Sequence, residues 1–507
     1  MNIKQAKQEI TNTLKAYLAK DQLGNYLIPT VRQRPVLLMG PPGVGKTQIM
    51  EQIAAETGVG LVAYTITHHT RQSAIGLPFI EKRTYGGEEV SVTEYTMSEI
   101  LSSVYRLMER TGLQEGILFL DEINCVSETL APMMLQFLQC KTFGNQALPE
   151  GWLIVAAGNP PEYNKSVRDF DVVTLDRVKR IDVEEDYGVW KEYARRKNLH
   201  GAILSYLDIK KDNFYRIENT ADGLQFATAR GWEDLSELLY AYETLGIRAD
   251  REVVGQYIQM PRIAKDFANY LEMFYKYQKT YHVEGILSGT WENITVLELR
   301  EAPFDEKLSV MGLVLSRLSE EARNTRCQDA LTDALHTSLT EFREKIADAP
   351  PLTVLDQLLW KRRTAMKQAK EAGQLDKESR DLKQREINAL EDYRQRLDRE
   401  AVAPEGAMDA VRGWFGEEVE RRKAVAMETK DMFDNAFRFL ETTFSDSQEL
   451  VIFVTEITAG YDTSWFVEQF GCDAYFRHNR ELLFDSTRHR IREEITAAKA
   501  AEQEEHT

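Results

Sequence analysis

The feature that most constrains this chain is a short stretch near its start, where an apolar run leads into a glycine-rich turn. Residues 35–39 are rich in valine and leucine, which predicts a buried β-strand, and residues 48–54 have helical spacing. Between them lie Gly40, Pro41, Pro42, Gly43, Val44, Gly45, Lys46 and Thr47. Glycines let successive backbone N–H groups turn toward one anion, and the start of the next helix adds partial positive charge. The stretch therefore predicts a phosphate-binding loop between a strand and a helix.

Two side chains of this loop have the chemistry that a nucleoside triphosphate requires. Lys46 can reach the β- and γ-phosphates, and the Thr47 hydroxyl can ligate Mg²⁺. Together with Gln48, which follows directly, the loop residues are the predicted contacts to the nucleotide. We therefore expect ATP and Mg²⁺ as cofactors.

A second apolar run, residues 116–120, ends in the two acids Asp121 and Glu122. A strand of this kind places its last residues at the carboxyl edge of a parallel sheet, where open α/β sheets bind their ligands. We expect Asp121 to hold Mg²⁺, through its waters, and Glu122 to orient and deprotonate the attacking water. The alternative is an ordinary strand end, which an apolar run followed by Asp-Glu usually marks. The preceding phosphate loop favours the catalytic interpretation.

The next buried strand, residues 152–158, leads into Asn159. An amide at that edge can hydrogen-bond both the γ-phosphate and the attacking water, so Asn159 is a candidate sensor of ATP against ADP. In isolation it would be a turn residue at a strand end. Farther along, Arg177 could reach the γ-phosphate bound by a neighbouring subunit and stabilise charge in the transition state. Arg180 competes for this role, and a surface salt bridge is the alternative for either arginine.

Length and composition set the broad class. A chain of 507 residues suggests about three domains, and 43% apolar residues suffice for a core. The apolar runs are too short for a membrane span and the first residues lack a secretory signal, so we expect a cytoplasmic protein. The four cysteines show no paired spacing, which indicates reduced structural thiols rather than a zinc site or disulfides.

The formal net charge of −18 works against sequence-independent binding to nucleic acid, because such binding needs many cationic contacts to phosphates. A local basic groove remains compatible with this charge. A protein partner or client is favoured over DNA.

The phosphate loop, Asp121 with Glu122, Asn159 and Arg177 together resemble the core of the AAA+ ATPases, with its Walker A and Walker B motifs. Two hairpins expected over residues 76–93 and 141–148, together with the sequence Leu-Asp-Arg that ends at Arg177, resemble the MoxR-like branch. This resemblance implies a parallel sheet with strand order 5-1-4-3-2 and a ring, commonly a hexamer, with ATP at subunit interfaces. It covers roughly the first 285 residues.

The resemblance also implies an α-helical lid, in which Arg230 matches the sensor arginine that contacts the nucleotide. Val178 departs from the family, where an aromatic residue often follows the finger arginine; the choice between Arg177 and Arg180 therefore stays open. Before the first strand, Ile28 and Arg32 are candidates for the adenine side of the site, with plain packing as the alternative.

Three domains are expected: an α/β nucleotide-binding domain over 1–186, the lid over 187–285 and a helical region over 286–507. In the last region, residues 355–371 and 375–399 predict an antiparallel helical hairpin joined at Gly373, and a long helix is expected over 408–443. The hairpin is either a solvated arm packed on itself or a docking platform for a partner.

The leading functional hypothesis is an ATP-driven remodeller of a protein client. MoxR-like ATPases commonly act beside a partner with a von Willebrand factor A-type domain, and this chain lacks the Asp-x-Ser-x-Ser sequence of that domain's metal site. Such a partner would therefore be a separate chain. The alternatives are a ring motor acting on nucleic acid in a restriction or defence system, and a nucleotide switch that does not hydrolyse. Glu122 argues against the switch, because it is a water-activating carboxylate.

Overall fold

The computed structural model describes residues 1–480 except 69–75, 86–87, 144–145, 164–166, 168–169, 221–222, 373–374, 376 and 446. The chain divides into two compact units: unit 1 comprises Met1–Val189 and Leu355–Asn388, and unit 2 comprises Trp190–Val354 and the chain from Ala389 onward. Among the described residues, no helix is long and apolar enough to cross a bilayer.

Unit 1 contains a five-stranded sheet in which neighbouring strands are parallel, in the order β2-β5-β8-β1-β9. The elements before the lid are α1 (Ile3–Leu18), η1 (Thr30–Arg32), β1 (Val36–Met39), α2 (Lys46–Thr57), β2 (Gly60–Thr65), η2 (Ile66–His68), β3 (Pro78–Tyr85), β4 (Glu88–Tyr95), α4 (Glu99–Thr111), β5 (Gly116–Asp121), α5 (Ala131–Cys140), β6 (Thr142–Phe143), β7 (Gln146–Ala147), β8 (Trp152–Gly158), α6 (Val172–Leu175) and β9 (Lys179–Asp182). With these five strands numbered along the chain, the order is 5-1-4-3-2, as expected for an AAA+ core.

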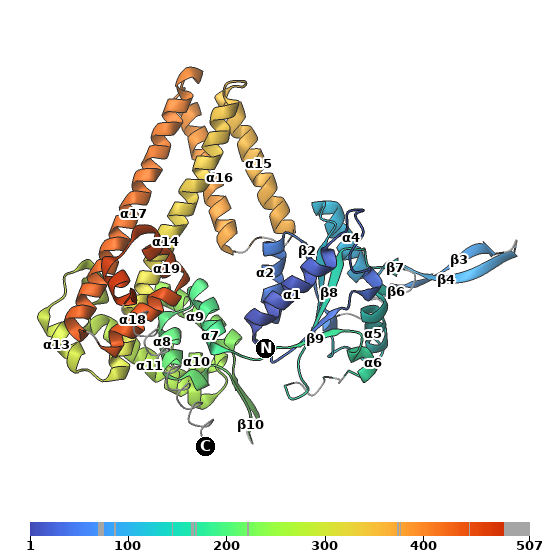
Figure 1. The fold of residues 1–507 in the computed structure, drawn as a ribbon, viewed down its shortest axis with the longest axis horizontal. Coiled ribbons are helices and arrows are strands. Elements are labelled where there is room, and N and C mark those ends of the chain that lie inside the picture. Colours follow the sequence, from blue (N-terminus) through green and yellow to red (C-terminus); the bar gives the residue numbers. More distant parts are fainter. Residues whose placement is uncertain are drawn as a thin grey trace, which may run out of the picture. The chain divides into compact units, whose positions relative to one another are not determined.

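Helices cover both faces of this sheet (Figure 1). Alternate residues of β1 point to opposite faces: Leu37 packs in a core that includes residues of α4 and α5, whereas Val36 and Leu38 pack in a core with α1 and α2. Every residue of β1 and β8 is buried, as expected for central strands of a parallel sheet covered on both sides. The strands therefore form a rigid frame for the loops at their carboxyl ends.

Both expected hairpins form. Strands β3 and β4 pair antiparallel from Pro78 with Tyr95 onward, and this hairpin extends away from the rest of unit 1 (Figure 1). Strands β6 and β7 make a shorter antiparallel pair. The predicted turn residues 86–87 and 144–145 lie outside the described residues.

The expected helical hairpin is present as α15 (Pro351–Glu371) and α16 (Lys377–Arg399). An ion pair between Arg362 Nε and Glu386 Oε1, 2.9 Å long, joins the two helices. The proposed joint at Gly373 lies outside the described residues. The boundary between the units runs through both helices.

Unit 2 is largely helical. Its elements are most of α7 (Tyr187–Arg196), α8 (Gly201–Ile209), η3 (Lys211–Asn213), β10 (Arg216–Thr220), β11 (Gly223–Ala227), α9 (Ala229–Leu245), α10 (Arg251–Tyr257), α11 (Pro261–Thr280), α12 (Val283–Ser288), α13 (Asn293–Glu301), α14 (Phe304–Lys345), η4 (Pro404–Gly406), α17 (Ala407–Phe444), α18 (Gln448–Ala459) and α19 (Tyr461–Phe470). Residues 187–285, the expected lid, are mostly helical, and the long helix expected over 408–443 is present as α17.

Among the elements of unit 2 without an individual prediction, one long helix and one hairpin are the most prominent. Helix α14 spans 42 residues, and its buried positions include polar residues such as Thr325, Gln328 and Ser338, so apolar residues alone do not mark its buried face. The hairpin β10–β11 was also missed, because its strands are five residues long and carry mixed polar and apolar side chains.

A buried lysine in unit 1 provides a stability prediction. Lys141 follows α5 with φ of 56°, its side chain is 8% exposed, and its Nζ donates to the Thr30 carbonyl at 3.0 Å. Burial lowers the pKa of Lys141 to about 8. Between about pH 8 and the ordinary pKa of lysine, Lys141 loses its proton in the folded chain but keeps it in the unfolded chain. The free energy of unfolding should therefore rise with pH in this range.

We expect Lys141→Met to raise the free energy of unfolding by about 1–2 kcal/mol at pH 7, because a buried ammonium is replaced by an apolar chain of similar length. Thermal or denaturant unfolding of both proteins between pH 7 and 10 measures this. The free energy of unfolding of the variant should also rise less with pH, because the contribution of Lys141 is absent. Lys82→Met, at an exposed position of β3, is the control and should keep the wild-type slope. Equal slopes in wild type and Lys141→Met would contradict the assignment.

Candidate nucleotide site

The phosphate loop lies between β1 and α2, as the sequence predicts. Gly45 precedes α2 with φ of 92°, in the left-handed region that a residue with a Cβ rarely adopts. At Gly40 a Cβ would come within 2.7 Å of the Val183 carbonyl oxygen, so the chain beyond β9 closes on the loop's first residue. Glycine is required at both positions for different reasons, one conformational and one steric.

Lys46 lies inside the loop and is 8% exposed. Its Nζ donates to the carbonyl oxygens of Gly40 and Pro41, each at 2.8 Å, and to Asn159 Oδ1 at 2.9 Å. The ammonium therefore sits between the first turn of the loop and the end of β8. This brings together two predicted residues that are far apart in the sequence.

Thr47 and Asp121 form the second contact between distant motifs. Thr47 Oγ1 donates to Asp121 Oδ2 at 3.0 Å, so a hydroxyl and a carboxylate from neighbouring elements converge. These hard oxygen donors suit Mg²⁺, which commonly keeps several waters and binds one or two protein oxygens. The residues present therefore fit the ion, although no cluster of three or more His, Cys, Asp or Glu suited to a metal occurs among the described residues.

Glu122 follows β5 with φ of 57°, an uncommon backbone conformation for a residue other than glycine. Its N–H donates to Asp121 Oδ1 at 2.9 Å, and its Oε2 accepts a hydrogen bond of 2.7 Å from Thr67 Oγ1. Thr67 lies in η2, just after β2. Sequence reasoning missed Thr67, because nothing in the sequence indicates which polar residue after β2 faces the end of the neighbouring strand β5.

The two candidate finger arginines lie elsewhere on unit 1. Arg177 is exposed, its Nη1 donates to Gln139 Oε1, and the N–H of nearby Lys179 donates to the Pro35 carbonyl at 2.8 Å. Arg177 therefore lies where β9 and β1 begin, whereas the phosphate loop lies where β1 ends. Arg180, the second residue of β9, is paired with Asp182 at 2.8 Å.

Arg230 is the second residue of α9 in unit 2, and it is exposed. Thr228 caps this helix by accepting from the Gly231 N–H at 3.3 Å. The helix start and the arginine's place in it agree with the sequence-based expectation. Its contact with a nucleotide stays a prediction.

The contacts of residues 19–34 favour the packing alternative for Ile28 and Arg32. Lys20 pairs with Glu115, the residue before β5, at 2.7 Å, and the Ile28 carbonyl accepts from the buried Gln33 side chain. Residues 19–34 therefore lie at the amino edge of the sheet, opposite the phosphate loop. The chain start lies beside the loop instead: Ile3 approaches Gly45, because α1 runs from one edge of the sheet to the other.

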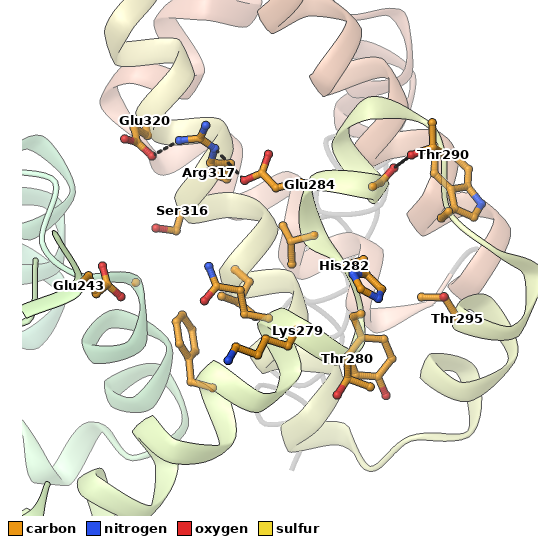
Figure 2. Close-up of a pocket in the computed structure, with 18 of the residues that line it drawn as sticks. Glu243, Lys279, Thr280, His282, Glu284, Thr290, Thr295, Ser316, Arg317 and Glu320 are labelled. Atoms are coloured by element: carbon orange, nitrogen blue, oxygen red, sulfur yellow. Dashed lines mark hydrogen bonds and ion pairs between the residues drawn. The ribbon is translucent and has the colours of Figure 1, made fainter. Parts of the chain in front are cut away.

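A separate cavity of about 990 Å³ lies within unit 2, lined by residues of α8, α9, α11, α12, α13 and α14 (Figure 2). Arg317 in its wall pairs with Glu284 at 3.3 Å and with Glu320 at 2.6 Å. His200, also in the wall, contacts Glu243 at 2.9 Å. None of the predicted site residues lines this cavity, and several of its charged groups already pair with one another.

Comparisons with known proteins found one family model and a distant solved structure. Residues 35–178 match the family model of the AAA domain, dynein-related subfamily. A solved structure of a "putative ATPase" from Cytophaga hutchinsonii is 17% identical with a TM-score of 0.22, and the match covers 36% of this chain and 52% of that one. The chain thus spans about half the length of that structure. No curated protein matches. The matched range runs from the start of β1 to the residue before β9 and includes Lys46, Asp121, Glu122 and Asn159, so this part of the chain is similar to the AAA domain of the dynein-related subfamily.

Proposed function

We propose that this protein is an ATPase that hydrolyses ATP to ADP and phosphate at the carboxyl edge of the unit 1 sheet. The observation that supports this most is the pair of contacts that join three motifs: Lys46 with Asn159 at 2.9 Å and Thr47 with Asp121 at 3.0 Å. In a merely structural loop there would be no reason for a cation, a hydroxyl, a carboxylate and an amide to converge at one helix start.

Each side chain has a defined task in this proposal. The loop N–H groups and Lys46 bind the phosphates, and Thr47 with Asp121 would hold Mg²⁺, which neutralises charge on the phosphates when bound. Glu122 accepts a proton from the attacking water, and Asn159 orients that water against the γ-phosphate. Arg230 would contact the nucleotide from the lid, which we propose to span residues 187–285.

We further propose that Arg177 acts on the site of a neighbouring subunit in a ring, commonly a hexamer in related ATPases. Arg177 lies at the amino edge of its own sheet, and its own phosphate loop lies at the opposite edge. Exposed apolar residues occur nearby in the chain: Val172 in α6 is 81% exposed. If the amino edge of one copy faces the carboxyl edge of the next, the contact joins two different surfaces and is heterologous. Repeated contacts of this kind close into a ring when the rotation between copies permits. The ion pair with Asp182 makes Arg180 the weaker candidate.

The proposed biological role is the remodelling or assembly of a protein client, with a von Willebrand factor A-type protein as a separate partner. The hairpin β3–β4 supports a contact with protein, because it carries exposed apolar side chains such as Ile80 and Val90. The test is to isolate the assembled Glu122→Gln variant with MgATP and identify what copurifies. A specific protein released by the additional change Ile80→Asp would support a client contact at the hairpin, and capture unaffected by that change would contradict it.

One observation favours the alternative of a motor on nucleic acid. In unit 2 a cavity of about 940 Å³ is lined by five cations and three aspartates; the cations are Lys210, Lys211, Arg216, Arg262 and Lys265. Phosphates of a nucleic acid would suit this local excess of positive charge. ATP turnover that DNA or RNA stimulates, with the stimulation lost at raised salt and in Arg262→Glu, would support this alternative. Turnover indifferent to both nucleic acids would eliminate it.

A further inference from the structure

The turn after Glu122 is bonded to the end of β8 at two consecutive residues. Ile123 N–H donates to the Ala157 carbonyl at 2.9 Å, and Asn124 Nδ2 donates to the Asn159 carbonyl at 2.8 Å. The first bond joins backbone to backbone, as in the sheet itself. The second depends on one side chain, Asn124, which is 3% exposed.

The Asn124 side chain is also fitted sterically to β8. A Cβ at Gly158 would lie 2.6 Å from Asn124 Oδ1 and 2.9 Å from Asn124 Cγ. The amide group therefore fills the space that a side chain at residue 158 would otherwise take. Gly158 and Asn124 form a complementary pair directly beside Asn159.

Stability alone does not account for this asparagine. Its Oδ1 is buried and has no hydrogen-bond partner within the part of the chain that the structure describes. Burying an acceptor without a donor is destabilising, whereas an apolar side chain of the same shape would avoid that penalty. The single bond to the Asn159 carbonyl is what distinguishes asparagine from leucine here.

We propose that Asn124 is a positioning residue for ATP hydrolysis. It holds the backbone of Asn159 at a fixed distance from the turn that carries Glu122, so that the proton-accepting carboxylate and the water-orienting amide keep their relative geometry. This inference rests on the proposed ATPase function. Misplacing one catalytic group by about 1 Å can cost about a hundredfold in rate while leaving phosphate contacts intact.

The test is steady-state hydrolysis of MgATP by wild type and Asn124→Leu, together with binding of a fluorescent ATP analogue and thermal unfolding. We expect kcat to fall by tenfold or more, the Kd of the analogue to change by less than about threefold, and the melting temperature to be unchanged or raised. Asn435→Leu is the matched control, because Asn435 Nδ2 donates to the Leu287 carbonyl at 2.8 Å in unit 2. It should leave kcat unchanged.

A second pair of variants separates positioning from packing. Gly158→Ala alone should displace Asn124 and lower both kcat and the melting temperature. In Asn124→Ala/Gly158→Ala the added methyl occupies the freed space, so the melting temperature should recover while kcat stays low. Recovery of kcat in the double variant would overturn the proposal, as would an Asn124→Leu protein with kcat within twofold of wild type. Absence of hydrolysis by wild type would instead overturn the proposed function, and this inference with it.

Discussion

Replacing Arg177 by alanine should lower ATP turnover by about 10³-fold or more, the loss seen when a trans-acting arginine is removed from a phosphoryl-transfer site. The reason is geometric: Arg177 lies at the amino edge of its own sheet, away from its own phosphate loop, and the proposed role therefore places its charge at the site of another copy. Nucleotide binding should weaken much less than turnover. Arg180→Ala is the matched comparison and should have a far smaller effect, because Arg180 is paired with Asp182 on its own strand.

Mixing two inactive proteins tests the trans assignment directly. Arg177→Ala keeps an intact phosphate loop, and Lys46→Ala keeps an intact arginine, so a mixed ring contains interfaces with both. Phosphate release should reappear on mixing and increase with the share of mixed interfaces. A mixture that stays inactive, although an affinity tag on one variant captures the other, would contradict action in trans.

Glu122→Gln should lower turnover by about 10²–10⁴-fold, because glutamine cannot accept the proton of the attacking water. ATP should still bind, since the phosphates contact the loop and Lys46, and glutamine can keep the hydrogen bond with Thr67. Phosphate release and analogue binding measure the two quantities separately. Glu115→Gln is the control, because Glu115 pairs with Lys20 at the opposite edge of the sheet and its loss should leave turnover unchanged.

Two outcomes would count against Glu122 as the base. Turnover equal to wild type would show that another group accepts the proton or that none is needed. A loss of ATP binding as large as the loss of turnover would show that Glu122 supports the loop instead. The expected pattern, binding retained with turnover lost, would also make this variant the reagent for trapping an assembled ring.

The central strands of unit 1 could be predicted from the sequence because their burial is uniform. In β1 and β5 almost every residue is apolar, and a glycine-rich turn or a pair of acids marks where each strand ends. The order of the strands in the sheet could not be predicted in this way. It came from the resemblance to AAA+ ATPases, because the chain's apolar pattern does not state which strands are neighbours.

Long-range packing explains what could not be predicted. The buried face of α14 includes the polar residues Thr325, Gln328 and Ser338, so apolar residues alone do not reveal the periodicity of this helix. Ile28 and Arg32 were candidates because the segment before the first strand often lines the adenine pocket in such domains, with packing as the alternative; their contacts at the amino edge favour packing. Sequence distance from a motif does not determine the edge of a sheet on which a loop lies.

The sequence predicted the motif residues of the candidate site. It did not reveal the residues that hold those motif residues in place. Lys46, Thr47, Asp121 and Asn159 converge as expected. Thr67 and Asn124 are polar residues in short turns, and their contacts to Glu122 and Asn159 cross between strands. A signal for Asn124 exists in hindsight: a polar residue within an otherwise apolar stretch, Ile-Asn-Cys-Val, directly after the two acids.

The central claim is that the carboxyl edge of the unit 1 sheet binds ATP and hydrolyses it. The most direct measurement is phosphate release from MgATP by purified wild type and by Lys46→Ala, with bound nucleotide measured in the same samples. The account predicts steady phosphate release by wild type, and neither bound nucleotide nor release in the variant. Wild type that neither retains ATP nor releases phosphate, or a Lys46→Ala protein that behaves like wild type, would contradict it.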